Sequence, residues 1–295
     1  MSGNENIGQA EKISRENKKV ENFTVLMSVY FKEKSEYLKD SLISVMNNTV
    51  IPNEIIIVED GPLTTELYRC LDEMQDIYPC IKRVKLPRNE GLGKALNIGI
   101  SACTNNLVAR MDTDDICVPD RFQRQLDFFR ENDVDVLGGQ IIEFDEPMKT
   151  AIAYRYVPTT DEQIKSFAKT RCPMNHMTVM YKKSVIESVG GYRNILYFED
   201  YDLWVRLILN GAIFANLSEV LVHVRAGNSM LSRRGGIKYA KLELNFLREL
   251  HDIGFLSTRE FLRAAFVRTP VRLMPKNLRK MIYTVFLHKR RKIRE

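Results

Sequence analysis

The hydrophobic positions of the first 150 residues follow two alternating patterns, one typical of buried strands and the other of helices. Short runs with apolar residues predict strands at residues 23–30, 54–60, 81–86, 107–111 and 134–144, the last as one strand or a strand pair. Apolar residues at helical spacing predict helices at residues 37–48, 64–78, 92–103 and 118–132. Apolar strands that alternate with helices are typical of a parallel sheet covered on both faces, so we expect an α/β fold.

The pattern is less regular after residue 150. It predicts helices at 161–170 and 201–210, strands at 177–182 and 220–225, and helix from 236 to the end, interrupted at Gly254, Pro270 and Pro275. The polar start of the chain is expected to be disordered. We therefore expect a disordered segment (1–21), an α/β domain (22–230) and a helical, basic, amphipathic C-terminal region (231–295).

The composition is that of an ordinary soluble globular protein, with 44% hydrophobic and 28% charged residues. The five cysteines are odd in number and form no C-x-x-C pair, which argues against a zinc ribbon or a disulfide framework and suits a reducing compartment. The N-terminus has no apolar h-region, and no apolar run approaches the roughly 20 residues that span a bilayer. A cytoplasmic location is expected.

The net charge of +6 is unevenly distributed. Residues 257–295 contain twelve Lys or Arg and two Glu, a local charge of +10, whereas the rest of the chain carries −4. Apolar residues such as Leu262 and Phe266 interleave with the basic ones, and such a segment can lie on an anionic membrane surface. The alternative is a solvated basic face whose apolar side packs on the rest of the protein.

Three carboxylates, Asp112, Asp114 and Asp115, follow the predicted strand 107–111 in the stretch "MDTDD". A helix N-terminus would explain one of them, as a cap for the helix after Pro119, but not three. Parallel α/β sheets bind ligands at the carboxyl ends of their strands, and carboxylates with substrate phosphates are typical Mg²⁺ ligands. The cluster therefore predicts a site that holds a diphosphate through a divalent cation.

Other strand ends also carry polar groups. Ser28 and Tyr30 follow the first predicted strand, and Glu59 and Asp60 follow the second, although "EDGP" alone is also a turn signal. "NEGLGKAL" resembles a phosphate-binding loop, but Arg88 stands where the first glycine is needed and Ala95 replaces Ser or Thr. Its glycines either let a ligand approach the backbone or turn the chain into the helix.

A second acidic cluster begins the predicted helix 201–210. Glu199, Asp200 and Asp202 can all stabilise a helix N-terminus, and we assign that role to Asp202. Aromatic residues flank Glu199 and Asp200, and an apolar pocket with neighbouring carboxylates raises the pKa of one, as a general base requires. His176, with the polar Asn175 before it, is either structural or a site residue.

These stretches together resemble family 2 glycosyltransferases of the GT-A fold. The resemblance covers about residues 23–230 and depends on the order of "SVY", "IIIVEDG", "NEGLGKALNIGI", "MDTDD" with "PDR", "NHMTVM", "GGYR" and "FEDYDLWVRL". The chain is most similar to enzymes that build bacterial capsule, exopolysaccharide or O-antigen. The resemblance implies a mixed, Rossmann-like nucleotide-binding sheet flanked by helices, with the basic helical region as an extension.

The resemblance also implies roles for individual residues. Asp200 matches the catalytic base and Glu199 a neighbour that orients the acceptor or the base. Asp112, Asp114 and Asp115 match the region that contacts ribose and the metal, with Asp114 and Asp115 favoured as metal ligands. Nucleotide and donor binding falls to Ser28, Tyr30, Asp60, Gly91, Lys94, Asn97, Asp112 and Asp114. The donor–acceptor region includes Asn175, His176, Trp204 and Arg225. Many relatives carry a histidine where Gly227 stands, so a diphosphate contact there would fall to Arg225.

The implied reaction is an inverting transfer from a nucleotide-diphosphate sugar, with a UDP-sugar favoured, to a hydroxyl of a growing lipid-linked surface polysaccharide. The implied cofactor is Mn²⁺ or Mg²⁺, and the transferred group is hexosyl or N-acetylhexosaminyl. The protein is expected at the inner face of the cell membrane, which it would contact through residues 257–295. No nucleic-acid partner is expected. A sugar nucleotidyltransferase would carry a Gly-rich loop after the first strand, where "SVYFKEKSEY" has no glycine, and a nucleic-acid-binding protein would not explain the acidic clusters.

Overall fold

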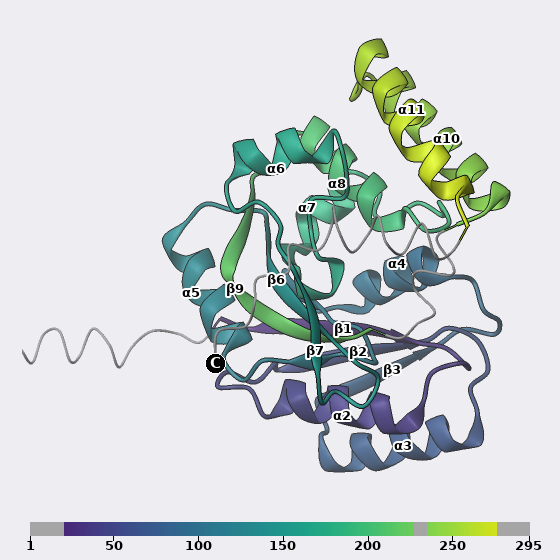
Figure 1. The fold of residues 1–295 in the computed structure, drawn as a ribbon. Coiled ribbons are helices and arrows are strands. Elements are labelled where there is room, and N and C mark those ends of the chain that lie inside the picture. Colours follow the sequence, from purple (N-terminus) through teal and green to yellow (C-terminus); the bar gives the residue numbers. More distant parts are fainter. Residues whose placement is uncertain (1–20, 227–234, 276–295) are drawn as a thin grey trace, which may run out of the picture.

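The computed structural model describes residues 21–226 and 235–275. Its strands form one mixed sheet in the order β3-β2-β1-β4-β8-β6-β9-β5, with β7 paired to β6 (Figure 1). The strands are β1 (Phe23–Val29), β2 (Glu54–Glu59), β3 (Ile81–Lys85), β4 (Leu107–Arg110), β5 (Ile116–Cys117), β6 (Val136–Phe144), β7 (Ala151–Arg155), β8 (Met180–Lys182) and β9 (Phe214–Arg225).

The sheet has a parallel half, as expected, and a mixed half. β1 pairs in parallel with β2 and β4, and β2 pairs in parallel with β3. β8 is antiparallel to both β4 and β6, whereas β6 and β9 are parallel. The carboxyl ends of β1, β2 and β4 therefore meet at one edge, which is where parallel sheets bind ligands.

Most of the predicted helices are present, with shifted boundaries. The helices are α2 (Ser35–Met46), α3 (Thr65–Ile77), α4 (Leu92–Ala102), α5 (Arg121–Glu131), α6 (Asp161–Ala168), the 3-10 helix η1 (His176–Thr178), α7 (Lys183–Ser188), α8 (Glu199–Leu209), α10 (Ile237–Asp252) and α11 (Thr258–Leu273). The sequence pattern did not predict β5, β7 or α7. β5 and α7 complete too few periods to be recognised, and β7 lacks a buried face, since none of its residues is buried. It was also wrong at residues 177–178, which belong to η1, and it began β9 six residues too late.

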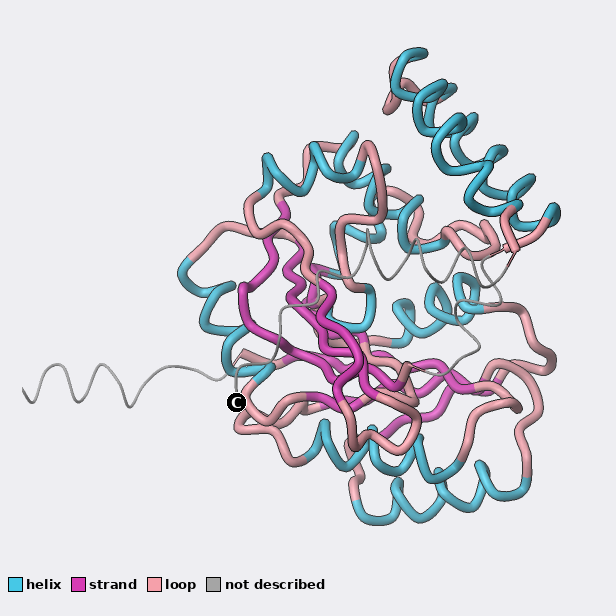
Figure 2. Tube along the Cα trace, viewed as in Figure 1, coloured by secondary structure: helices cyan, strands magenta, loops and turns pink. Residues whose placement is uncertain are grey.

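Helices cover both faces of the sheet (Figure 2). Successive strand residues point to opposite faces, so Val25 and Met27 pack with α2 and α3 while Leu26 packs with α4. Residues of α6, α7 and α8 join α4 in the second hydrophobic cluster.

The helices α10 and α11 form a hairpin that packs on α8 through α10 (Figure 1). Phe246 of α10 stacks on Phe198 with ring centroids 4.6 Å apart. The buried carboxylate of Glu243 pairs with Arg268 and Arg272 of α11 at 2.5 and 2.7 Å. The helical prediction is confirmed for the described part, and Gly254 ends α10, but Pro270 lies inside the last turns of α11 instead of interrupting it. The predictions for residues 1–20, 227–234 and 276–295 lie outside the described residues.

Candidate active site

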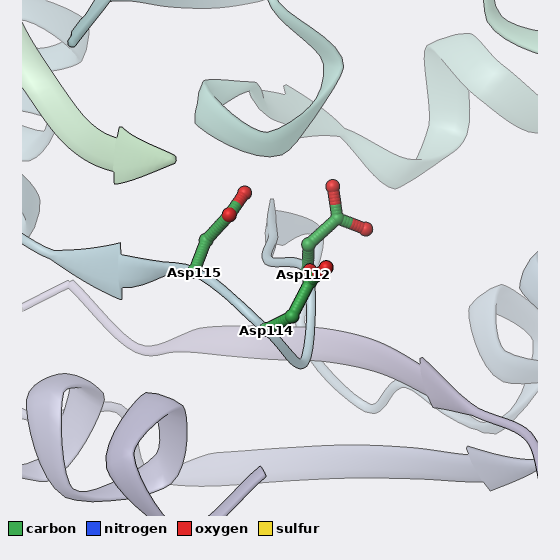
Figure 3. A group of neighbouring side chains, drawn as sticks. All are labelled: Asp112, Asp114 and Asp115. Carbon is green, nitrogen blue, oxygen red and sulfur yellow. The ribbon is translucent and has the colours of Figure 1, made fainter. Parts of the chain in front are cut away.

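The loop between β4 and β5 brings Asp112, Asp114 and Asp115 together (Figure 3). One carboxylate oxygen of each lies within 4.8 Å of the others. Burial raises the pKa of Asp114 to about 7, and repulsion from Asp112 and Glu33 adds to the shift. Burial, followed by the charges of Asp114 and Asp112, likewise raises the pKa of Asp115 well above its ordinary value. A cation would relieve this repulsion, so the geometry suits the expected metal site.

Arg225, at the end of β9, holds this loop in place. Its backbone N–H donates to Asp115 Oδ1 (3.0 Å), and its Nε donates to the carbonyl of Asp114 (3.1 Å). The guanidinium also donates to the carbonyl of Glu146 and lies 3.9 Å from the ring centre of Tyr37. The predicted site residue Arg225 thus lies next to the acidic cluster, where its hydrogen bonds fix the loop. Gly227 lies outside the described residues.

Sequence reasoning missed Arg110, the last residue of β4. Its Nη2 forms an ion pair with Asp112 Oδ1, and its side chain is only 4% exposed. The signal was present, since the strand that leads into "MDTDD" ends in a basic residue. Among the residues that the structure describes, no other side chain donates to the carboxylate of Asp114 or of Asp115, and Asp115 Oδ1 accepts only from the backbone N–H of Arg225. These hard oxygen donors fit a divalent cation such as Mg²⁺ or Mn²⁺.

Asp60 lies at the end of β2, as expected, and its carboxylate binds the loop before α4. Oδ1 accepts from the backbone N–H of Glu90 (2.7 Å) and Oδ2 from that of Gly91 (3.2 Å). At Gly61, which has φ +89°, an added Cβ would lie 2.6 Å from the backbone nitrogen of Asn89. Asp60 and Gly61 therefore fix the edge of the predicted nucleotide site, with Ser28 half-buried beside them on β1.

The remaining predicted donor residues lie on or near α4 and β1. Gly91 is the N-cap of α4 and turns the chain at φ +88°, with open space around the position of a Cβ. Lys94 is exposed and pairs with Glu90 at 2.9 Å. The amide of Asn97 donates to the carbonyl of Tyr192 (2.6 Å) and accepts from its N–H (2.7 Å), so this side chain joins α4 to the loop before α8. Tyr30, beyond β1, is 37% exposed.

Glu199 and Asp200 form the start of α8, and the N-cap residue Phe198 makes no side-chain capping bond. Burial raises the pKa of Glu199 to about 7, with a smaller contribution from the charge of Asp200. Asp200 is half-buried; its Oδ1 accepts from the N–H of Tyr201 (2.8 Å) and its Oδ2 from the thiol of Cys172 (3.3 Å). Burial raises the pKa of that thiol well above its ordinary value, so it remains a donor.

Asp202 lies in the first turn of α8, as predicted, but its carboxylate is used in ion pairs and not as a cap of the helix N-terminus. Its carboxylate is 1% exposed and pairs with Arg193 at 2.7 Å and with Arg206 at 2.8 Å. A side chain four residues into the acidic stretch points inward on a helix, and only the folded chain brings Arg193 next to it. Asp202 therefore anchors the loop before α8.

Three of the predicted donor–acceptor residues, Asn175, His176 and Trp204, are buried in the protein. His176 is buried and its Nε2 lies 2.8 Å from the hydroxyl of Tyr192. Burial, and then the charge of Arg110, lower the pKa of His176 well below its ordinary value, so the ring is neutral. Trp204 is fully buried against His176 and Phe214, and any role of its side chain in binding is indirect. Asn175 is buried too and donates to the carbonyl of Gly139 (2.8 Å).

Tyr192 connects the two acidic clusters. Burial raises its pKa, and the charges of both Asp200 and Asp112 add to that shift, which places the ring within electrostatic range of each. On the other side, Gly93 of α4 packs so closely on Arg193 and Glu199 that a Cβ would lie 3.0 Å from the Arg193 carbonyl. Residues near Tyr192 and Gly93 thus lie between the acidic cluster and the pair of carboxylates on α8, which are far apart in sequence.

Comparisons with known proteins identify the family to which the chain belongs. Residues 24–189 match the model of the family described as Glycosyl transferase family 2. The chain is 41% identical over 266 residues to the amylovoran biosynthesis glycosyltransferase AmsE of Erwinia amylovora, which covers 88% of this chain and 97% of that protein. It is 38% identical over 262 residues to the UDP-Gal:alpha-D-GlcNAc-diphosphoundecaprenol beta-1,3-galactosyltransferase of Escherichia coli, which covers 88% and 94%. The fold is similar to that of S. aureus TarS 1-349 in complex with UDP-GlcNAc (TM-score 0.63, 16% identity, 91% of this chain and 76% of that one).

Proposed function

Because this chain belongs to glycosyl transferase family 2, and so is a glycosyltransferase of polysaccharide biosynthesis, we propose that it transfers a hexosyl or N-acetylhexosaminyl group from a UDP-sugar to a lipid-linked saccharide, with inversion at the anomeric carbon. The mixed GT-A sheet flanked by helices, which the sequence motifs implied, is confirmed. The observation that carries the proposal is the cluster of Asp112, Asp114 and Asp115, whose carboxylate oxygens lie within 4.8 Å of one another, in a fold that also fixes the carboxylate of Asp200 at the start of α8. Family membership sets aside the nucleotidyltransferase and nucleic-acid-binding alternatives.

The donor end of the site is the loop between β4 and β5. Asp114 and Asp115 would hold Mn²⁺ or Mg²⁺, because their free oxygens are the hard ligands that these ions prefer. A cation bound there would stabilise the negative charge that develops on the diphosphate leaving group. Asp112, which is paired with Arg110, remains for the ribose.

The acceptor end is the start of α8. Asp200 takes the proton from an acceptor hydroxyl as that oxygen forms a bond to the anomeric carbon. The bond from the anomeric carbon to the diphosphate oxygen breaks on the opposite face, and UDP leaves. The thiol of Cys172 and the N–H of Tyr201 fix the two oxygens of Asp200, which orients the base before the acceptor binds. Glu199, half-buried beside it, is suited to orient the acceptor hydroxyl.

The choice of donor and acceptor is supported by the Escherichia coli relative, whose name specifies UDP-Gal and a diphosphoundecaprenol-linked GlcNAc. The test is acceptor-dependent release of UDP across a panel of UDP-sugars, with undecaprenyl-diphosphate GlcNAc as acceptor. We expect one UDP-sugar to react, an inverted linkage by NMR, and loss of activity in EDTA that Mn²⁺ restores. If no UDP-sugar of the panel releases UDP, or if the product keeps the configuration of the donor, the proposal is contradicted. Full activity in EDTA would refute the proposed metal dependence alone.

A lipid-linked acceptor gives the C-terminal region a role at the inner face of the membrane. None of the residues of α11 is buried, and Phe266, at 82% exposed, lies on the same helix as Leu262 and Val267, which are also exposed. No helix in the described part of the chain is long and apolar enough to cross a membrane. The proposed contact is therefore one in which α11 and the basic residues that follow it in sequence lie on anionic lipid.

Flotation with vesicles that contain anionic lipid tests this contact. The double substitution Leu262→Ser and Phe266→Ser should reduce the floating fraction several-fold, because both side chains are exposed and neither supports the core. The matched control is Ile77→Ser, since Ile77 is also exposed (61%) but lies on α3, across the sheet from the hairpin (Figure 1). Equal flotation of the double variant and the parent protein would rule out the contact.

A further inference from the structure

Arg110 is a buried cation that the proposed reaction does not use. Its backbone N–H donates to the carbonyl of Val179 (2.8 Å), which holds the end of β4 against the start of β8. Its side chain is 4% exposed and pairs with Asp112 through Nη2. The other two guanidinium nitrogens, Nε and Nη1, have no hydrogen-bond partner in the described part of the structure. A buried, incompletely bonded charge costs stability, so its presence at this position needs a reason.

We propose that Arg110 is a positioning residue of the donor site. Its fixed positive charge keeps the three carboxylates together when no cation is bound, and it weakens the binding of a cation until the nucleotide binds. The inference rests on the proposed function, because it requires the acidic cluster to hold a divalent cation. Arg110 is the last residue of β4 and lies outside the "MDTDD" stretch, so its position is set by the packing of that strand.

The positive charge that faces the cluster comes from Arg110. Among the described residues it is the only cationic side chain with an ion pair to Asp112, Asp114 or Asp115. The guanidinium of Arg225 is directed elsewhere, to two backbone carbonyls and to Asp40 at 3.6 Å. Because an arginine does not lose its proton in proteins, the counter-charge is permanent.

The unpaired nitrogens leave part of this charge without a neutralising partner. Its influence reaches His176, where it adds to burial in lowering the pKa, and Tyr192, which lies between the clusters. A divalent cation at Asp114 and Asp115 is repelled by the same charge. The diphosphate of the donor brings the negative charge that offsets this repulsion, so the cation and the nucleotide bind tightly only together.

The test is direct titration of Mn²⁺ in the absence of nucleotide, with free Mn²⁺ followed by EPR. Arg110→Gln and Arg110→Met remove the charge and should tighten Mn²⁺ binding on the order of tenfold or more, because a unit charge a few ångströms from a divalent ion opposes binding even at a high effective dielectric constant. Arg110→Lys keeps the charge and should stay within about threefold of the parent protein. Either neutral variant suffices if the other does not fold, as judged by circular dichroism and Tm.

Arg124→Gln is the matched control, since Arg124 is an exposed arginine of α5 that pairs with Asp120 at 2.6 Å and forms no ion pair with the three carboxylates of the cluster in the described part of the chain. It should leave Mn²⁺ binding unchanged. Unchanged or weaker binding in the folded neutral variants would overturn the role of Arg110 while leaving the metal site intact. Absence of Mn²⁺ binding in every form, with or without UDP, would instead overturn the metal role in the proposed function, and Arg110 with it.

Discussion

Replacing Asp200 with Asn removes the proton acceptor of the proposed reaction while keeping the shape of the side chain. In the parent protein, Oδ1 accepts from the N–H of Tyr201 and Oδ2 from the thiol of Cys172. The Asn side chain can keep the first bond through its amide oxygen, and its NH₂ group then faces the sulfur, a weak acceptor. The fold should therefore lose no more than about 1 kcal/mol.

The effect on turnover should be far larger than the effect on stability. A positioned general base typically contributes 10²- to 10⁴-fold, so kcat should fall by roughly that factor, which is about 3–5 kcal/mol in the barrier. The donor KM should change little, because the loop between β4 and β5 that would hold the diphosphate is untouched. The two acidic clusters lie on different elements, the loop between β4 and β5 and the start of α8, and the substitution alters only the second.

The assay is steady-state release of UDP with saturating lipid-linked acceptor, together with the donor KM and the Tm of each variant. Near-parental kcat for Asp200→Asn would refute the assignment of the base. A fall in kcat accompanied by a large fall in Tm would point instead to a structural role for Asp200. Asp202→Ala is the comparison for that second outcome, because it removes a neighbouring carboxylate that is structural.

Two further predictions concern the same helix. Asp202→Ala leaves Arg193 and Arg206 without their shared buried carboxylate and should lower the free energy of unfolding by about 3–5 kcal/mol, measured by urea denaturation. Glu199 has a folded pKa of about 7 against 4.5 when unfolded, so its ionisation opposes folding increasingly as the pH rises from 4.5 to 7, and fully above that. Glu199→Gln should therefore stabilise the protein by up to about 3 kcal/mol at pH 8 and hardly at pH 4, and an equal effect at both would contradict the burial of this carboxyl.

Local patterns predicted the elements with a clear buried face and missed those, such as β5 and β7, that lack one. The helices of the first half were recognisable because each completes several turns with its apolar residues on one side. β5, with two residues, has no pattern of its own and exists because it pairs with β9 at Ile116 and His223. The same limit explains Asp202, whose partner Arg193 precedes the helix and reaches it only through the fold.

The sequence by itself determined the family, the α/β class and the chemical identity of both acidic clusters, because these depend on residue order and on short-range periodicity. Tertiary structure decided what each polar group does. It paired Asp112 with Arg110, placed the backbone of Arg225 on Asp115 across 110 residues, and buried Trp204 in the core. The physical reason is that charge pairing and burial depend on which strands become neighbours, and the sheet order, unlike the periodicity of one strand, is set by contacts across the whole chain.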